Sequence, residues 1–359
     1  MQPFVYHGLP SRVVFGQGTL SRLAEEIEQL GCRRALVLAT PQQQEQARAV
    51  LEQLGERGAG LFTEAAMHTP VEVTERAMRV VEELTVDCTV AIGGGSTIGL
   101  GKAIALRTGL PQVAIPTTYA GSEMTPILGE TRDGIKTTQR TLEVLPETVI
   151  YDVDLTLSLP AGMSGTSGIN AIAHAVEALY ARDRNPVISL MAEEGIAALA
   201  RSLPVIAGDP GNAEARADAL YGAWLCGTCL GSVGMSLHHK LCHTLGGSFD
   251  LPHAETHTIV LPHAVAYNAP AAPEAMSRIA RALGCEDPAA GLFDLARAVG
   301  APTALEEIGL KPSDVERATE IATRNPYWNP REVEAQGIHR LLSHALVGHR
   351  PASEEGVQT

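Results

Sequence analysis

Thr89-Val-Ala-Ile-Gly-Gly-Gly-Ser96 decides the fold of this 359-residue chain. Apolar, partly β-branched residues run into three glycines, and a helical pattern follows over Thr97–Thr108. Glycines without a Cβ let the backbone close on a ligand, and a helix start offers free N–H groups and the positive end of the helix dipole. The stretch therefore predicts a pyrophosphate-binding loop, although a glycine triplet alone also fits an ordinary tight turn. The loop residues expected to bind are Gly93, Gly94, Gly95 and Ser96.

Short strands alternate with amphipathic helices on both sides of this loop. The expected strands are Ser11–Phe15, Arg34–Ala39, Cys88–Ile92, Gln112–Ile115 and Thr148–Tyr151, and the helices between them include Gly18–Gln29, Gln43–Leu54 and Val71–Glu83. Such alternation indicates a parallel sheet with helices on both faces. From about Leu157 the strand signal stops and the remaining segments have helical periodicity. The sequence thus predicts an α/β domain over residues 1–156 and an all-α domain over residues 157–359.

A second loop, Ile115-Pro-Thr-Thr-Tyr-Ala-Gly-Ser-Glu-Met-Thr125, follows the next expected strand. Loops at the carboxyl ends of parallel strands line the ligand crevice of such sheets. Thr117, Thr118 and Ser122 offer hydroxyl groups to phosphates or to a nicotinamide amide. Lone hydroxyls in loops are usually turn formers, but hydroxyls gathered beside a glycine loop are expected to contact a nucleotide.

Histidines gather in the second half, within Met235-Ser-Leu-His-His-Lys-Leu-Cys-His243. His239 and His243 are four residues apart, so they share one face of a helix. His253 follows ten residues later, in a proline-containing break. This spacing fits a metal site or a proton-transfer site. An isolated pair of helical histidines can also be solvated or satisfied by backbone groups.

Composition narrows the class of protein. The net charge of −14 argues against nucleic acid and anionic membrane surfaces as partners. The N-terminus has no signal-peptide pattern and no apolar run reaches membrane length, so a cytoplasmic location is expected. The six cysteines are then expected to be reduced thiols, with Cys226 and Cys229 filling the core.

Taken in order along the chain, these motifs resemble those of the iron-containing (group III) alcohol dehydrogenase superfamily. The resemblance rests on Val14-Phe-Gly-Gln-Gly18, the glycine loop with Lys102, the Pro116-Thr-Thr loop, Asp152 to Leu155, Leu159-Pro160, the helix with Asn170 and His174, and the later histidines. It implies a Rossmann-like N-terminal domain, a helical C-terminal domain, and a cleft between them for NAD(P) and substrate.

Within that superfamily the chain is similar to the maleylacetate reductases. Pro-Thr-Thr-Tyr-Ala-Gly-Ser-Glu-Met-Thr-Pro126 and Asn325-Pro-Tyr-Trp-Asn-Pro-Arg331 are typical of that branch. The similarity implies NAD(P)H-dependent reduction of the C=C bond of maleylacetate to 3-oxoadipate in the degradation of aromatic compounds. It also implies a small dianionic oxo-acid substrate and a homodimer. Candidate partners for the substrate carboxylates are Lys136, Arg140, Lys240 and Arg324, together with free N–H groups at helix starts such as Ser164–Gly168.

One departure from the superfamily bears on the chemistry. The four metal-ligand positions of metal-dependent relatives map to Asn170, His174, His239 and His253, so an amide replaces the carboxylate. A divalent ion loses its anionic ligand, although three imidazoles can still hold zinc. We therefore expect no required divalent metal and regard the set as a vestigial site. His243 and His253 are expected to donate the proton and stabilise the enolate, while His239 and His174 orient them or bind a carboxylate.

NADH is the expected cofactor, with NADPH possible as a second one. The end of the second strand, Leu38-Ala-Thr-Pro-Gln42, has no carboxylate to repel a 2′-phosphate and no arginine to bind one, which leaves Thr40 as a cofactor contact. Three alternatives stay open: a metal-dependent alcohol dehydrogenase or carbonyl reductase, a lyase similar to dehydroquinate synthase, and a non-enzymatic nucleotide-binding protein.

Overall fold

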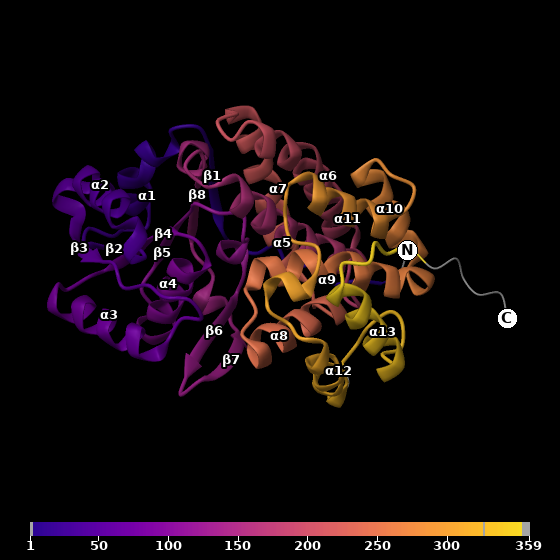
Figure 1. Ribbon diagram of the computed structural model, residues 1–359. Helices are drawn as coiled ribbons and strands as arrows, with labels where there is room; N and C mark the ends of the chain where they lie inside the picture. Colours follow the sequence, from indigo (N-terminus) through magenta and orange to yellow (C-terminus); the bar gives the residue numbers. More distant parts are fainter. Residues whose placement is uncertain (1–2, 326, 354–359) are drawn as a thin grey trace. The chain divides into compact units, whose positions relative to one another are not determined.

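The computed structural model describes residues 3–325 and 327–353 and divides the chain into two compact units. One is an α/β unit, Gly8–Leu159, and the other is a helical unit that starts at Pro160 and includes residues 3–7. The break lies three residues later than the sequence analysis places it, because the 3-10 helix Val153–Thr156 follows the last strand and closes the α/β unit. Figure 1 labels the elements of each unit.

A six-stranded parallel sheet forms the centre of the α/β unit, in the order β1-β8-β5-β4-β2-β3. Its strands are β1 (Arg12–Gly16), β2 (Ala35–Leu38), β3 (Gly58–Phe62), β4 (Cys88–Gly93), β5 (Gln112–Pro116) and β8 (Thr148–Asp152). The central strands β2, β4 and β5 are buried along their whole length, as expected for a sheet covered on both faces. This confirms the predicted fold class.

The helices cover both faces of this sheet because side chains alternate along each strand. Val37 points into one apolar cluster, which includes Ile27 and Val50 of α1 (Leu23–Gln29) and α2 (Gln44–Leu54). Its neighbours Leu36 and Leu38 point into a second cluster, with residues of α3 (Val71–Glu83) and α4 (Gly95–Thr108).

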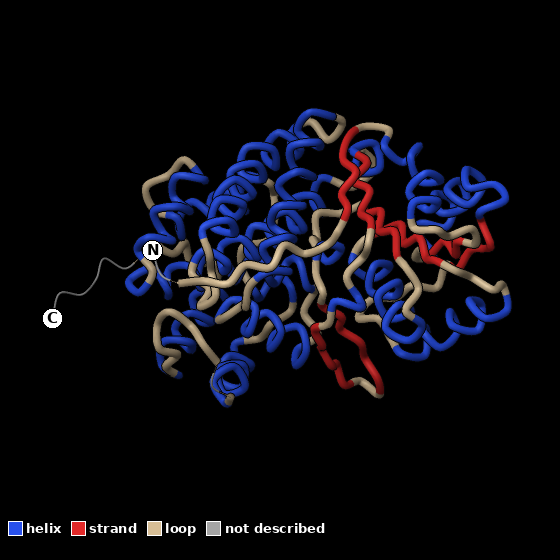
Figure 2. The backbone as a smooth tube through the Cα atoms, turned by 180° about the vertical axis from the view of Figure 1, so that it is seen from behind, coloured by secondary structure: helices blue, strands red, loops and turns tan. Residues whose placement is uncertain are grey.

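Two strand regions were missed by the sequence analysis. β3 reads Gly-Ala-Gly-Leu-Phe, and its glycines weaken the strand pattern. Strands β6 (Ile127–Arg132) and β7 (Ile135–Arg140) form an antiparallel ribbon, which Figure 2 shows as a separate hairpin. Asp133 and Gly134, which both have positive φ, make the turn between the two strands. An Asp-Gly pair is a recognised hairpin signal, but the exposed, polar β7 offers no apolar face to accompany it.

Nine longer helices build the described part of the helical unit. They are α5 (Ala161–Leu179), α6 (Pro186–Gly208), α7 (Ala213–Ser232), α8 (Leu237–Phe249), α9 (His253–Asn268), α10 (Pro273–Leu283), α11 (Pro288–Ala298), α12 (Val315–Arg324) and α13 (Ala335–Leu346). Glycines let α5, α6 and α7 approach closely: a Cβ on Gly168 would lie 2.6 Å from Leu203 Cδ2, and one on Gly195 would lie 2.8 Å from Cys226 Sγ. The second half is therefore all-α, as predicted.

Helix α9 was not predicted, because Pro252 precedes it and Pro262 interrupts its pattern. His253 is its first residue, so the expectation that this histidine lies in an irregular break was wrong. The consequence is structural: His253 and His257 are one turn apart on a helix, with the same spacing as His239 and His243 on α8.

All six cysteines are free thiols in the structure, and Cys226 and Cys229 are buried in α7. Burial raises the pKa of both thiols. Among the described residues, no single helix is long and apolar enough to cross a membrane. The bent pair α7 and α8 meets the length and composition test only when the two are taken together.

Candidate active site

The loop between β4 and α4 is closed tightly around its glycines. Gly93 has a φ of 151°, and a Cβ there would lie 2.5 Å from Thr97 Oγ1 and 2.6 Å from Gln43 Oε1. A Cβ on Gly94 would lie 3.2 Å from Thr118 Cγ2. Gly95 then opens α4 with nothing within 4 Å of its Cβ position. The loop thus leaves free N–H groups at an open helix start, which is the arrangement that binds phosphate.

The loops after β2 and β5 surround this glycine loop. Gln43 Nε2 donates to Thr117 Oγ1 at 3.0 Å, and Thr40 Oγ1 donates to Gln43 Oε1 at 3.3 Å. The Thr117 N–H donates to the Gly93 carbonyl at 3.1 Å. Strand order reverses between β2 and β4, and dinucleotides bind at such switch points. The structure therefore brings Thr40, Thr117 and Thr118 to the glycine loop.

Lys102 ties the second loop to α4. Its side chain is fully buried, and Nζ donates to the carbonyl oxygens of Ser122 (2.6 Å), Thr125 (2.6 Å) and Ile127 (2.9 Å) and to Thr125 Oγ1 (2.8 Å). This contact fixes the backbone of Ser122, another of the hydroxyl residues predicted to contact the nucleotide. Lys102 was noted in the motif, but its positioning role was not predicted.

Replacing Lys102 by Met is expected to weaken NADH binding about ten-fold or more and to destabilise the fold by roughly 3 kcal/mol. Buried carbonyl oxygens would lose their donor, and the Thr117–Ser122 loop would lose its anchor. Fluorescence titration with NADH and urea unfolding measure the two effects. Lys311→Met, at an exposed lysine, is the control and should change neither. An unchanged dissociation constant for NADH in Lys102→Met would contradict the positioning role.

Six histidines from three helices form one cluster in the helical unit. The residues of this histidine cluster are His174 on α5, His238, His239 and His243 on α8, and His253 and His257 on α9. Ring centroids lie 5.2 Å apart for His174 and His239, 5.0 Å for His239 and His257, 6.1 Å for His239 and His243, and 4.4 Å for His253 and His257. The structure therefore brings the four predicted histidines together and adds two that were not predicted, His238 and His257.

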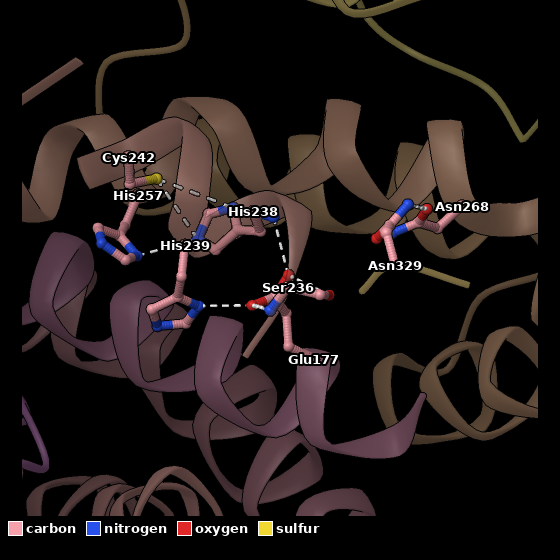
Figure 3. Close-up of polar contacts among 8 residues, drawn as sticks. All are labelled: Glu177, Ser236, His238, His239, Cys242, His257, Asn268 and Asn329. Carbon is pink, nitrogen blue, oxygen red and sulfur yellow. Dashed lines mark hydrogen bonds and ion pairs between the residues drawn. The ribbon is translucent and has the colours of Figure 1, made fainter. Parts of the chain in front are cut away.

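Glu177 orients His239. This buried carboxylate accepts hydrogen bonds from His239 Nδ1 at 2.7 Å, from the N–H groups of Ser236 (2.9 Å) and His238 (2.8 Å), and from Ser236 Oγ (3.0 Å), as Figure 3 shows. Burial by itself raises the pKa of Glu177, but the hydrogen bond and charge of His239 and the other donors outweigh it and bring the pKa to about 2. The bond places the hydrogen of His239 on Nδ1 and turns Nε2 away from the carboxylate.

His238 and His257 make a second buried pair, with His238 Nε2 2.9 Å from His257 Nδ1 and the Cys242 thiol 3.7 Å from His238 Nε2 (Figure 3). Burial, followed by the charges of neighbouring histidines, lowers the pKa of His238 to about 3 and that of His257 well below its usual range. Burial and the same neighbours also lower the pKa of His174. These three rings are therefore neutral near pH 7, whereas His243 and His253 have exposed side chains.

Several buried polar atoms in this cluster have no hydrogen-bond partner among the described residues. They are Asn170 Oδ1, His174 Nδ1, His239 Nε2 and His257 Nε2. An unsatisfied buried polar group costs about 1–3 kcal/mol, so such a group usually meets a ligand or water. Their gathering on α5, α8 and α9 marks a site that receives a polar molecule.

The cluster does not fit the iron site that the superfamily implies. Asn170 supplies an amide where the carboxylate ligand belongs, and the nearby carboxylate, Glu177, is held by His239 and the start of α8. Among the described residues, His238, Cys242 and His257 place their ligand atoms within 4.8 Å of one another. The three histidines at the superfamily's ligand positions, His174, His239 and His253, do not form such a group. Iron sites of this kind combine imidazole with carboxylate, so the donor set is unsuited to it.

Comparison with known proteins assigns the class. Residues 10–153 match the family described as iron-containing alcohol dehydrogenase, and residues 164–346 match its C-terminal domain, described as Fe-containing alcohol dehydrogenase family, C-terminal. The chain belongs to the iron-containing alcohol dehydrogenase family and is an oxidoreductase.

Among individual relatives, the chain is 57% identical to a maleylacetate reductase of Rhizobium sp. (strain MTP-10005), over 98% of this chain and 100% of that protein. It is 58% identical to a maleylacetate reductase of Sphingobium indicum, over 97% and 99%. The crystal structure of maleylacetate reductase from Agrobacterium tumefaciens superimposes with a TM-score of 0.96 at 58% identity, over 98% and 100%. These relatives confirm the resemblance seen in the sequence.

Proposed function

We propose that this protein uses NAD(P)H to reduce the C=C bond of maleylacetate to 3-oxoadipate, a step in the degradation of aromatic compounds. The observation that carries the proposal is the histidine cluster with Asn170 in place of a carboxylate ligand, in a chain with full-length similarity to maleylacetate reductases. A site built for proton transfer suits conjugate reduction of an enone.

Reduction of this substrate needs a hydride and a proton at adjacent carbons. The hydride from the nicotinamide adds to the alkene carbon β to the ketone, and negative charge moves onto the ketone oxygen as an enolate. A proton then adds to the alkene carbon next to the ketone, which lies between the hydride-accepting carbon and the ketone carbon. The buried rings of His174, His238 and His257 are neutral near pH 7. We assign proton donation and enolate stabilisation to the two exposed histidines, His243 and His253.

The unpartnered buried atoms hold the substrate in this scheme. His239 Nε2 and His174 Nδ1 have no hydrogen-bond partner among the described residues, so in this proposal they bind a polar group of the substrate and orient it for protonation. Lys240 follows His239 on α8. Of the four candidate cations, it is the one that lies on a helix that also carries residues of the histidine cluster. We assign a substrate carboxylate to Lys240, whose Nζ lies 5.9 Å from the centre of the Tyr327 ring.

NADH is the proposed cofactor, with NADPH accepted. Thr40 follows β2, and its hydroxyl is engaged with Gln43, so this position offers neither a carboxylate nor an arginine to a 2′-phosphate. The proposal also includes the absence of a required metal, because the donor set lacks the anionic ligand. Both features follow from side chains at the site.

The test is NADH oxidation followed by absorbance with maleylacetate and, separately, with simple aldehydes and ketones. We expect rapid turnover of maleylacetate only, and full activity after dialysis against a chelator with no stoichiometric iron or zinc in the purified protein. Loss of activity on chelation, restored by Zn²⁺ or Fe²⁺, would favour the runner-up, a metal-dependent alcohol dehydrogenase or carbonyl reductase. No turnover of maleylacetate would overturn the proposal.

We further propose that the enzyme works in the cytoplasm as a homodimer and does not bind nucleic acid. β1 lies at one edge of the six-stranded sheet, and an edge strand has unpaired backbone groups that a second copy can use. The net charge of −14 opposes binding to nucleic acid. Sedimentation equilibrium measures the assembly, and a monomer at micromolar concentration would overturn the dimer.

A further inference from the structure

A cavity of about 230 Å³ opens in the helical unit beside the C-terminal half of α9. It is lined by residues of α9 and α13, by Arg331, and by His349, Pro351 and Ala352. Its histidine from α9, His263, is six residues beyond His257, the last cluster histidine on that helix, a separation of roughly 9 Å along the axis, and none of the six cluster histidines lines the cavity. The cavity is therefore separate from the histidine cluster.

The lining of this cavity is cationic. Among the residues that the structure describes, two arginines, Arg331 and Arg340, contribute positive charge to it beside three histidines, His263, His344 and His349, and no aspartate or glutamate does. The chain as a whole has a net charge of −14, so the concentration of positive groups is a local feature. Like charges gathered in one hollow repel each other, and a bound anion would relieve that repulsion.

His263 supplies a buried polar atom in the wall of this cavity. Its side chain lines the hollow and the residue is only 3% exposed, yet its Nε2 has no partner among the described residues. Burial, then the charges of His344 and His349, lowers its pKa to about 3. A neutral ring with an unsatisfied nitrogen at the wall of a polar hollow indicates a missing hydrogen-bond partner.

Arg331 is held in position for recognition. Its guanidinium lies 4.5 Å from the centre of the Tyr267 ring, and Nη1 donates to the Tyr267 carbonyl at 2.9 Å. Asn329 Nδ2 donates to the Arg331 carbonyl, which fixes the backbone of this segment. Arg340, in contrast, is exposed on α13 and makes no ion pair with any described residue. Arg331, the last residue of the stretch Asn325–Arg331, thus contributes to one wall of this cavity.

We propose that this cavity binds a small dianionic oxyanion, inorganic phosphate or a short dicarboxylate. Planar guanidinium groups pair with carboxylate and phosphate through two parallel hydrogen bonds, and histidine N–H groups add further donors. The volume lies below the usual 300–1,000 Å³ of drug-sized ligand sites, which excludes a nucleotide. The proposal does not depend on the reaction assigned above.

Isothermal titration calorimetry tests the site with sodium phosphate and with sodium succinate, against sodium chloride at matched ionic strength. Saturating NADH is present throughout so that phosphate does not enter the glycine loop. Arg340→Ala and His349→Ala are compared with wild type, and Arg79→Ala, an exposed arginine on α3, is the matched control. Thermal unfolding of each variant confirms that it is folded.

Saturable binding of one anion is expected, weakened about ten-fold or more by Arg340→Ala and unchanged by Arg79→Ala. The anion whose affinity is lower for Arg340→Ala than for wild type identifies the class of ligand that the cavity binds, phosphate or dicarboxylate. Equal affinities in Arg340→Ala and Arg79→Ala would overturn the proposal, since any binding would then lie elsewhere. Absence of saturable heat from both anions up to about 10 mM would also overturn it. Turnover of maleylacetate plays no part in either outcome.

Discussion

Replacing His253 by alanine is expected to lower kcat about 100- to 10,000-fold while leaving the dissociation constant of NADH unchanged. General acid catalysis contributes rate factors of this size, and His253 is an exposed ring at the start of α9, next to buried rings that are neutral near pH 7. The nucleotide contacts lie on different elements, the loops after β2, β4 and β5. Stopped-flow NADH oxidation and NADH titration measure the two quantities.

His243→Ala shares the prediction, because its ring lies 6.1 Å from that of His239 and its side chain is also exposed. His339→Ala, at an exposed histidine of α13, is the control and should retain turnover. A solvent isotope effect should accompany proton transfer in the wild type. Near-normal turnover in both His243→Ala and His253→Ala would refute the assignment, and a loss in only one would name the proton donor.

The architecture was largely predictable because its signals are local. A parallel sheet buried on both faces requires continuous apolar strands such as β2 and β4, and helices with one apolar face such as α3. The elements that were missed have weak local patterns: glycines dilute β3, the ribbon strand β7 is exposed throughout, and a proline interrupts α9. Contacts with neighbouring elements, rather than the local sequence pattern, therefore determine the secondary structure of these segments.

The site was predicted only in part for a related reason. Spacing placed His239 and His243 on one face, but the assumption of a break at Pro252 hid the identical spacing of His253 and His257. The role of Glu177 depends on α5 meeting the start of α8, which no local pattern reports. One signal was available: Ala-Ile-Ala-His-Ala-Val-Glu-Ala-Leu places a single carboxylate in a mostly apolar stretch of helix, and a buried charge needs a partner.

Glu177→Gln is expected to destabilise the helical unit by roughly 3 kcal/mol at pH 7. The carboxylate accepts four hydrogen bonds. In the glutamine variant the amide oxygen accepts only weaker hydrogen bonds, and the NH₂ group, which cannot accept, faces the remaining donors. His239 would also lose the partner that fixes its ring, so kcat should fall with it. Urea unfolding and steady-state kinetics measure both changes.

The difference in free energy of unfolding between wild type and Glu177→Gln depends on pH if Glu177 acts through its buried charge, and not if it acts only through packing. Glu177 has a folded pKa of about 2, below the ordinary value of 4.5, so its stabilisation is complete above pH 4.5 and is lost as the pH falls toward 2. His238, with a folded pKa of about 3, makes both proteins less stable from about pH 6.5 downward, by about 1.4 kcal/mol per pH unit. The charge of Glu177 raises the pKa of His238, so the ring stays neutral in both folded proteins between pH 7 and 4.5. The gap in free energy of unfolding between wild type and Glu177→Gln should therefore stay constant over that range and narrow below it. A gap that stays the same down to pH 3 would mean that Glu177 acts through its shape, and the ionised carboxylate beside His239 would have to be abandoned.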